Sequence, residues 1–443
     1  MKKLFVCSLT IMLLVLSFME CSNVTSSDVI RERFPNGLTV IVKSNPDSKV
    51  LGVNILGKNR SAMEPEGKTG IADFTNRMLL KGTKARSAEM ISVDLASIGA
   101  EMTVTDNPFI PYDDVYTTHS FTFIKFQTID EFTDQGIALL SDLVINPIFP
   151  EEEIAKTKQE MMGIMGRSKG STSETCRQLF YSTLFQDHPY GKPILGDAMS
   201  ISSISRDDLV AFHQKFYSPN NMILAVVSNL PADQMMNKIK STFGNMPRFD
   251  FPEPQIPLPA PLSAPVKVEK EMEKEQVYIY LGELMPGIES PDVYALTLMN
   301  SVLSSRLGLN LREVKGLAYS VGSSVNFDRG FGWFIAAMGT RPQNYQVALD
   351  GILEEIKNIK AENVTEAELE KAKNGIWGNM LMYRLSRINQ AYYMCINEFE
   401  GVGYDYDNKY IENLRKVTIE QVKQAAEKYL NTDNYILAVV GKL

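Results

Sequence analysis

The sequence predicts an α+β fold built from two homologous halves, and three observations support this prediction. Six prolines lie between positions 252 and 265, a density that excludes helices and sheet ladders and marks a linker. The segments on either side of this linker repeat each other in a constant register. Each half combines short apolar strand patterns with long helical patterns, which favours strands covered by helices.

The repeat is clearest near the end of each half. Both copies contain an N-capped helix, a turn and the strand pattern Ile-Leu-Ala-Val-Val. Ile436 follows Ile223 by 213 positions, and Lys428 follows Lys215 by the same distance. A weaker echo relates residues 99–104 to residues 316–321, and both of these segments follow helical sequence. The register is too regular for a chance match, so the halves are interpreted as homologous.

Hydrophobic periodicity predicts the elements within the halves. Strands are expected in the first half at 38–42, 50–56 and 121–128. Helices are expected there at 71–80, 88–98 and 151–167. In the second half, Thr365 and Glu368 form a capping box, which predicts a helix over 365–384.

The first residues read as an export signal and not as part of the fold. A basic start is followed by an apolar run over 4–18, which is shorter than a membrane span of about 20 residues. Cys21 lies where a lipoprotein cysteine would lie, but Glu20 is a poor residue before a lipidated cysteine, and simple cleavage nearby is the alternative. We therefore expect an exported protein, either periplasmic or membrane-anchored as a lipoprotein.

Domain bounds follow from the signal and the linker. They are 1–27 for the export signal, 28–247 for the N-terminal domain, 248–265 for the proline-rich linker and 266–443 for the C-terminal domain. The formal net charge of −8 argues against nucleic-acid binding, which needs a basic face. Beyond the signal region, the cysteines are Cys176 and Cys395. Two buried free thiols are expected, with one long-range disulfide as the alternative.

Six motifs in a fixed order connect the chain with a known family. They lie at 36–40, 70–72, 78–83, 188–191, 217–222 and 312–321. With these motifs the chain resembles the pitrilysin/insulinase-like zinc metallopeptidases, a family that includes mitochondrial processing peptidase. The resemblance implies the mitochondrial-processing-peptidase-like metallohydrolase fold, in which two homologous α+β halves close like a clamshell around a central cavity.

The family's zinc motif is degenerate in this chain. Members with activity carry His-x-x-Glu-His on a helix, which supplies two zinc ligands and a general base, and a distant glutamate completes the site. Here Asp73 and Arg77 replace the two histidines, and Asn76 replaces the general base. Ile164 occupies the position of the distant glutamate. The resemblance implies that this chain binds no metal and cannot hydrolyse a peptide bond alone. Arg77 would repel a divalent metal, and we expect it to pair with Asp73 at i,i+4.

A second motif of the family is retained. In active relatives, an arginine and a tyrosine with the spacing Arg-x6-Tyr reach toward the scissile peptide, and Arg312 and Tyr319 have this spacing. The arginine can hold a peptide carbonyl, and the phenol can donate to a developing oxyanion. Without the family context, these residues would be interpreted as a solvated cation at a helix end and a strand aromatic.

Two further features bear on the site. His119, His188 and His213 are the histidines of the chain, and none has ligand spacing with another, so each is interpreted as structural. The family's substrate-binding edge strand usually carries an Asn-Ala pair, but the corresponding residues 102–105 lack it. An extra loop at 106–114 follows, and its two prolines cannot donate to a ladder, which places β-augmentation by a peptide in doubt.

The resemblance implies a function that needs a second subunit. The chain would be the non-catalytic, peptide-binding subunit of a heterodimeric exported zinc metallopeptidase. A homologous partner subunit would carry the zinc, and this chain would supply Arg312 and Tyr319. The alternative is a catalytically dead scaffold or peptide-binding module of the same fold, and a third reading is residual hydrolysis by other residues.

Overall fold

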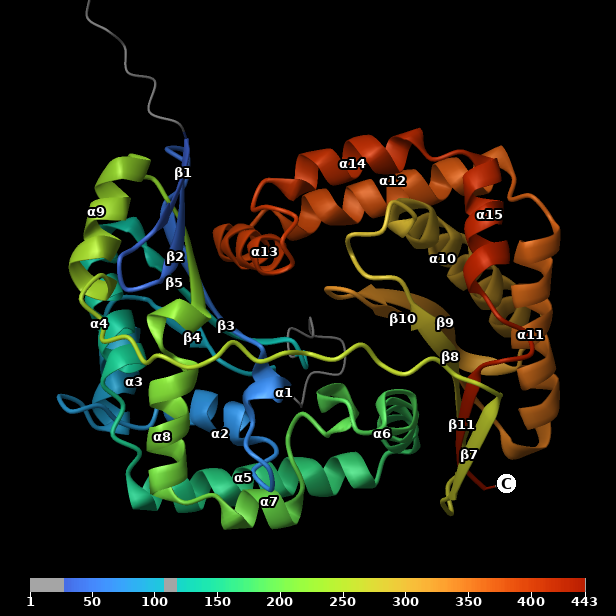
Figure 1. The fold of residues 1–443 in the computed structure, drawn as a ribbon, viewed down its shortest axis with the longest axis horizontal. Helices are drawn as coiled ribbons and strands as arrows, with labels where there is room; N and C mark the ends of the chain where they lie inside the picture. Colours follow the sequence, from blue (N-terminus) through green and yellow to red (C-terminus); the bar gives the residue numbers. More distant parts are fainter. Residues whose placement is uncertain (1–27, 107–117, 443) are drawn as a thin grey trace, which may run out of the picture.

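The computed structural model describes residues 28–106 and 118–442. The predicted export signal with Cys21 and residues 107–114 of the predicted extra loop lie outside the described residues. The described chain contains two mixed sheets, each made of strands from one half and surrounded by helices (Figure 1). The predicted α+β fold with two homologous halves is therefore confirmed.

The first half starts with strands and ends by returning a strand to the middle of its sheet. Its strands are β1 (Val29–Arg33), β2 (Thr39–Ser44), β3 (Val50–Lys58), β4 (Glu101–Thr103), β5 (Phe121–Ile129) and β6 (Met222–Ser228). Its helices are α1 (Arg60–Met63), α2 (Ile71–Met78), α3 (Ala88–Ser97), α4 (Thr133–Ile145), α5 (Glu151–Lys169), α6 (Thr172–Phe185), α7 (Ala198–Ser203), α8 (Arg206–Phe216) and α9 (Ala232–Phe243).

The second half repeats this plan with fewer strands. Its strands are β7 (Val266–Glu271), β8 (Val277–Met285), β9 (Ala318–Phe327), β10 (Gly332–Thr340) and β11 (Ile436–Gly441). Its helices are α10 (Val293–Leu307), α11 (Tyr345–Ala361), α12 (Glu366–Tyr383), α13 (Arg387–Phe399), α14 (Tyr406–Lys416) and α15 (Ile419–Tyr429). A π-helical segment, Gly308–Val314, joins α10 to β9.

The topology of the two sheets explains the sequence repeat. The strand orders are β1-β2-β6-β3-β5-β4 and β7-β11-β8-β10-β9. The repeated strands β6 and β11 each pair in parallel with one neighbour and antiparallel with the other. Ser205 and Thr418 are the N-caps of α8 and α15, the helices that precede β6 and β11, and each forms a capping box. Gly99 and Gly316 precede the edge strands β4 and β9 with φ values of 58° and 61°, a left-handed conformation that suits glycine.

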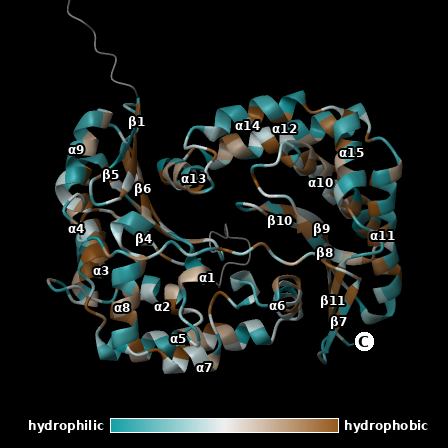
Figure 2. Cartoon of the chain, in the orientation of Figure 1, coloured by the Kyte–Doolittle hydropathy of each residue, from teal (hydrophilic) through white to brown (hydrophobic). Residues whose placement is uncertain are grey.

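The predicted elements agree with the structure apart from their ends. Helix α2 ends at Met78 instead of residue 80, and α5 continues to Lys169. Thr365 caps α12 through the predicted capping box with Glu368. Figure 2 shows hydrophobic residues along the first sheet, whereas α14 and α15 display hydrophilic residues. The apolar faces are thus buried between sheets and helices, as amphipathic patterns require.

The halves exchange one helix each. Helix α13 of the second half packs on β3 and β6 of the first sheet, and Cys395 joins Ile223 in that hydrophobic cluster. Helix α6 of the first half packs on β8 and β11 of the second sheet, where Cys176 joins Ala438. Both cysteines are buried free thiols, so the first of the two expected alternatives is confirmed. The exchange makes the two sheets parts of one packed unit (Figure 1).

A hairpin tip of the second half also contacts the first half. Asp328 accepts hydrogen bonds from Tyr190 (2.6 Å) and Ser120, and Arg329 donates to Asn59 Oδ1 (2.7 Å). A cavity of about 610 Å³ lies between the halves beside this tip. Within the two described ranges, no helix has the length and apolar character needed to cross a membrane.

Candidate functional site

Helix α2 carries the degenerate motif inside the first half. Gly70 precedes the helix with a φ of 87°, and every residue of the helix is buried. The Glu64 carboxylate accepts hydrogen bonds from the backbone N–H groups of Gly70 (3.1 Å) and Ala72 (3.3 Å). An acidic group at a helix N-terminus is favourable, but burial raises the pKa of Glu64 to about 7. Hydrogen bonds at its N-terminus therefore hold α2 in position, in addition to the packing of its buried side chains.

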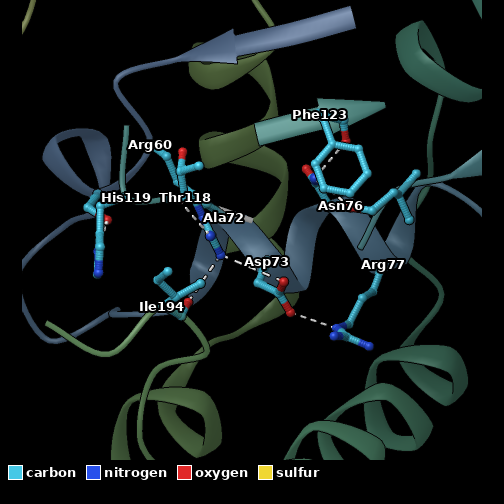
Figure 3. Close-up of polar contacts among 12 residues, drawn as sticks. Arg60, Ala72, Asp73, Asn76, Arg77, Thr118, His119, Phe123 and Ile194 are labelled. Atoms are coloured by element: carbon cyan, nitrogen blue, oxygen red, sulfur yellow. Dashed lines mark hydrogen bonds and ion pairs between the residues drawn. The ribbon is translucent and has the colours of Figure 1, made fainter. Parts of the chain in front are cut away.

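Asp73 and Arg77 form the ion pair that the sequence predicts. Arg77 Nε lies 2.6 Å from Asp73 Oδ2, one turn away on α2 (Figure 3). Arg77 Nη1 also lies 3.1 Å from Glu160 Oε1 on α5. The guanidinium of Arg77 thus joins α2 to α5 with a carboxylate on either side.

A second arginine approaches the same carboxylate. Arg60 on α1 is only 2% exposed, and its Nη2 lies 3.7 Å from Asp73 Oδ1. Its guanidinium also donates to the carbonyl oxygens of Thr118 and Ile194, both at 3.1 Å (Figure 3). We call Arg60, Asp73, Arg77 and Glu160 the buried ion cluster, because its charges alternate along a chain of contacts that is buried except at its outer end, where the Glu160 side chain is 53% exposed.

Asn76 occupies the general-base position, and both polar atoms of its side-chain amide form hydrogen bonds. Its Nδ2 donates to the carbonyl oxygens of Val104 (3.1 Å) and Phe123 (3.5 Å). Its Oδ1 accepts a hydrogen bond from the Tyr217 hydroxyl. Burial raises the pKa of Tyr217, so this phenol remains a donor. Asn76 therefore connects α2 to β5 and to the end of α8, and has no proton to exchange in catalysis.

Ile164 is buried on α5, with 4% of its surface exposed. The carboxylate that contacts α2 comes from Glu160, one helical turn earlier. Sequence reasoning missed Glu160, although the i,i+4 spacing places it on the same face of α5 as Ile164. It also missed Arg60, because a lone arginine on a four-residue helix gives no pattern that points to Asp73.

The buried ion cluster does not fit a zinc ion. Guanidinium groups stay protonated and offer no lone pair to a metal, and two of them surround the Asp73 carboxylate. Nor do the described ranges contain a group of three or more His, Cys, Asp or Glu side chains placed to hold a metal ion. The donor set at the motif positions is thus that of an ion-pair network and not that of a metal centre.

Each histidine makes contacts typical of a structural residue. His119, His188 and His213 are buried, and their ring nitrogens contact, in that order, Ser61 Oγ (3.2 Å), Pro257 O (3.0 Å) and Val144 O (2.8 Å). Burial lowers the pKa of His119 to about 3 and that of His213 to about 4, so both rings are neutral at neutral pH.

Arg312 and Tyr319 lie together on the surface of the second half. The Arg312 guanidinium carbon lies 5.9 Å from the centre of the Tyr319 ring, and its Nε lies 3.3 Å from Glu313 Oε1. Tyr319 is 78% exposed, at the start of the edge strand β9. Among the described residues, no hydrogen bond or ion pair joins this pair to α2. The structure therefore brings Arg312 and Tyr319 to each other, but not to Asp73 and Arg77.

Comparison with family models gives two matches that together cover most of the chain. Residues 39–198, which include the buried ion cluster, match the model described as insulinase (peptidase family M16). Residues 203–376 match the model described as the peptidase M16 inactive domain. The match to the inactive-domain model therefore concerns a segment that does not contain α2.

Related sequences extend over nearly the whole chain. A protein of Rickettsia felis named an uncharacterized zinc protease is 29% identical over 92% of this chain and 95% of its own length. A protein of Rickettsia bellii with the same name is 30% identical, over 79% of this chain and 82% of its own length. The uncharacterized zinc protease YmxG of Bacillus subtilis is 24% identical over 92% of this chain and 96% of its own length.

Solved structures share the fold. A peptidase M16 inactive domain from Pseudomonas fluorescens superposes with a TM-score of 0.85 at 22% identity, over 94% of this chain and 98% of that one. A protease from Helicobacter pylori gives 0.84 at 19% identity, over 93% and 99%. The periplasmic protease PqqL from Escherichia coli gives 0.77 at 17% identity, over 100% of this chain and 49% of its own. With matching family models, sequence relatives and fold, this chain belongs to the insulinase family, peptidase family M16.

Proposed function

We propose that this chain is the non-catalytic, peptide-binding subunit of a heterodimeric, exported zinc metallopeptidase. The observation that carries the proposal is the buried ion cluster, because the paired Asp73 and Arg77 and a hydrogen-bonded Asn76 stand where the family's chemistry needs zinc ligands and a base. The relatives named above are called zinc proteases. Since this chain has no fitting zinc ligands at α2, zinc is assigned to a homologous partner subunit.

Arg312 and Tyr319 are what this chain contributes to the partner's site. Their exposure supports the proposal, because residues that act on a substrate held by another subunit must be accessible. The guanidinium is suited to hold a peptide carbonyl oxygen, and the phenol is suited to donate a hydrogen bond to charge that develops on the scissile carbonyl. Neither residue acts as a general base in this assignment.

Export is part of the proposal. The basic and apolar pattern over 1–18 supports it, and PqqL, which shares the fold, is a periplasmic protease. The mature protein is assigned to the periplasm or to the membrane as a lipoprotein through Cys21. Mass spectrometry of the mature N-terminus distinguishes a lipidated cysteine from simple cleavage.

The test uses the reconstituted pair. This chain is combined with a homologous subunit that carries His-x-x-Glu-His, and hydrolysis of a mixed-peptide substrate is measured. Tyr319→Phe should lower kcat by about 10²–10³, the usual effect of removing one donor to an oxyanion. Arg312→Ala should also raise KM, because it weakens peptide binding. Tyr345→Phe, which alters a partly buried tyrosine at the start of α11, is the matched control and should leave kcat unchanged.

Two outcomes would contradict the proposal. If the pair is active and both variants at 312 and 319 keep full activity, these residues do not contact the substrate. If no homologous subunit gives activity with this chain, the alternative of a dead scaffold or peptide-binding module is favoured. Association of the subunits should survive both substitutions, since the residues are assigned to the substrate and not to the subunit contact.

A further inference from the structure

The tip of the β9–β10 hairpin separates two cavities of the molecule. The central cavity of about 610 Å³ lies on one side of it. On the other side lies a smaller pocket of about 240 Å³, which we call the outer pocket and which is lined by residues 253–256 of the proline-rich linker. Asp328 lines both. In Figure 1, the hairpin points from the second sheet into the central region. A movement of this short turn would therefore join the central cavity to the outer pocket.

The tip is held to the first half through one carboxylate. Asp328 is only 5% exposed, and it accepts hydrogen bonds from the hydroxyls of Tyr190 (2.6 Å) and Ser120. Its other oxygen accepts a hydrogen bond from the backbone N–H of Arg329 (2.6 Å), within the tip itself. Burial and the Asp328 charge raise the pKa of Tyr190, so this phenol remains a donor. Loss of the two hydroxyl contacts would release the carboxylate from the first half.

A second contact of the tip is incomplete. Arg329 Nη2 donates to Asn59 Oδ1 (2.7 Å), and its guanidinium carbon lies 4.1 Å from the centre of the Phe399 ring. Arg329 Nε and Asn59 Nδ2, however, are buried and have no hydrogen-bond partner among the described residues. Buried donors without acceptors cost free energy, and water would satisfy both if the tip moved away. This part of the contact therefore opposes the closed position of the tip.

A further carboxyl group faces the tip from α13. Glu400, at the C-terminal end of α13, lines the central cavity together with Asp328, and within the described ranges no hydrogen bond or ion pair reaches its side chain. Burial raises the pKa of Glu400 to about 8; the Asp328 charge adds to this rise, and the Arg329 charge opposes it. Two carboxylates that share a site repel each other when both are ionised. The closed position is therefore most stable while Glu400 carries its proton.

We propose that the hairpin tip, residues 328–331, is a pH-sensitive gate between the central cavity and the outer pocket. The gate is closed while the Glu400 carboxyl is protonated, and it leaves Tyr190 and Ser120 when Glu400 ionises beside Asp328. The packing of α6 and α13 on the two sheets stays in place, so the movement is confined to the turn. The inference is independent of the proposed function, because neither a peptide nor a partner subunit takes part in it.

The direction of the pH dependence follows from the two states of Glu400. In the closed state its pKa is about 8, and in the open state, in contact with water, the pKa returns toward its usual 4.5. Protonation of Glu400 thus favours the closed state fully below about pH 4.5, and this advantage is lost as the pH rises to about 8. The equilibrium constant for opening should increase by at most about tenfold per pH unit over this range and then level off.

Other charged or titratable groups surround the tip. Burial lowers the pKa of His188 below its usual 6.5 and that of His119 to about 3, so both rings are neutral above pH 6.5. Burial also lowers the pKa of Lys58 from its usual 10.5. The remaining groups on the hairpin, on α13 and on the walls of the two cavities are Arg177, Tyr181, Glu253, Glu289, Tyr383, Tyr392, Tyr393, Glu398 and Tyr406. A substitution at Glu400 alone separates its effect from theirs.

The experiment follows the accessibility of Trp333, which lies at the start of β10 next to the tip and lines the central cavity. The chain has two tryptophans, so Trp377→Phe leaves the fluorescence of Trp333 alone. Acrylamide, a neutral quencher, is added to the full mature chain at pH values between 6.5 and 9. The quenching constant should rise by at least about twofold across this range and level off above about pH 8, as the gate opens.

Four further variants, made in the Trp377→Phe chain, test the assignment. Glu400→Gln cannot ionise and should keep the low quenching constant at every pH. Glu398→Gln, on the same helix but paired with Arg31, is the matched control and should keep the rise. Asp328→Ala removes the acceptor of the Tyr190 hydroxyl and should give the high constant at every pH. Tyr190→Phe keeps the ring but removes one donor to Asp328, and it should shift the rise to lower pH by about one unit.

Two results would overturn the inference. One is a quenching constant that does not change with pH in the Trp377→Phe chain, and the other is a rise that persists in Glu400→Gln. Circular dichroism verifies that each variant is folded, and Tyr190→Phe still tests the gate if Asp328→Ala does not fold. Either result leaves the proposed function standing, because that function is tested separately by the activity of the reconstituted pair.

Discussion

The buried ion cluster and the Arg312–Tyr319 pair are both assigned from the family's motifs, but their surroundings are opposite. In the cluster, Asp73 and Arg77 are at most 9% exposed, and each charge has a partner. Tyr319 is 78% exposed, and Arg312 has one neighbouring carboxylate, on the adjacent residue. Charges that are buried and paired hold elements together, whereas exposed ones contribute little to stability and remain available for contact. The comparison separates a structural role from an interaction role.

The largest effect should come from breaking the buried ion cluster. Asp73→Ala leaves Arg60 and Arg77 without their shared carboxylate in a buried site, which should cost about 3–5 kcal/mol of unfolding free energy. Urea unfolding followed by circular dichroism measures the loss. A cost below about 1 kcal/mol would show that the cluster is not structural, and the comparison with Arg312 would fail.

A pH effect of similar size is expected from Glu64, beside the cluster. Its folded pKa of about 7 lies above its usual 4.5, so the folded state binds more protons between these values. Stability should therefore fall by about 3 kcal/mol as pH rises from 4.5 to 7, and then level off. Glu64→Gln should flatten this part of the stability profile. An unchanged slope in the variant would assign the pH dependence to other groups.

A smaller effect is expected from the hydroxyl that binds Asn76. Tyr217→Phe leaves the Asn76 carbonyl oxygen buried without its donor, which should cost about 1–3 kcal/mol. Phe212→Leu, nearby on α8, controls for the general sensitivity of that helix to changes in packing. If Tyr217→Phe leaves the unfolding free energy unchanged, the Tyr217 hydroxyl does not hold the Asn76 side chain, and the role given to this hydrogen bond is wrong.

The smallest effect on stability should come from the exposed pair. Arg312→Ala removes a contact with Glu313 and a ring contact with Tyr319, both on the surface, and should change the unfolding free energy by less than about 0.5 kcal/mol. The same urea measurement as for Asp73→Ala gives a direct comparison. A loss of more than about 2 kcal/mol would place Arg312 among the structural residues and remove the basis for its assigned role.

Much of the fold could be predicted from the sequence because the same helix, turn and strand patterns recur in both halves. The same strand pattern and a capping hydroxyl residue at a constant offset, Ser205 in one half and Thr418 in the other, predict the helix and strand at the end of each half. The exchange of α6 and α13 could not be predicted, because periodicity shows which face of a helix is apolar but not which sheet will cover it. At the site, the Asp73–Arg77 pair follows from helical spacing. The contacts of Arg60 and Glu160 depend on tertiary packing, and no local pattern contains them.

The helix exchange also sets an order for the completion of the fold. One face of the first sheet, around Ile223 and Ala225, is covered by α13, which is among the last elements of the chain to be synthesised. Until then, the first 250 or so residues carry an uncovered apolar sheet, which is prone to association. A fragment ending in the proline-rich segment would keep that surface permanently. Neither half is therefore expected to be stable as an isolated fragment, despite their common ancestry.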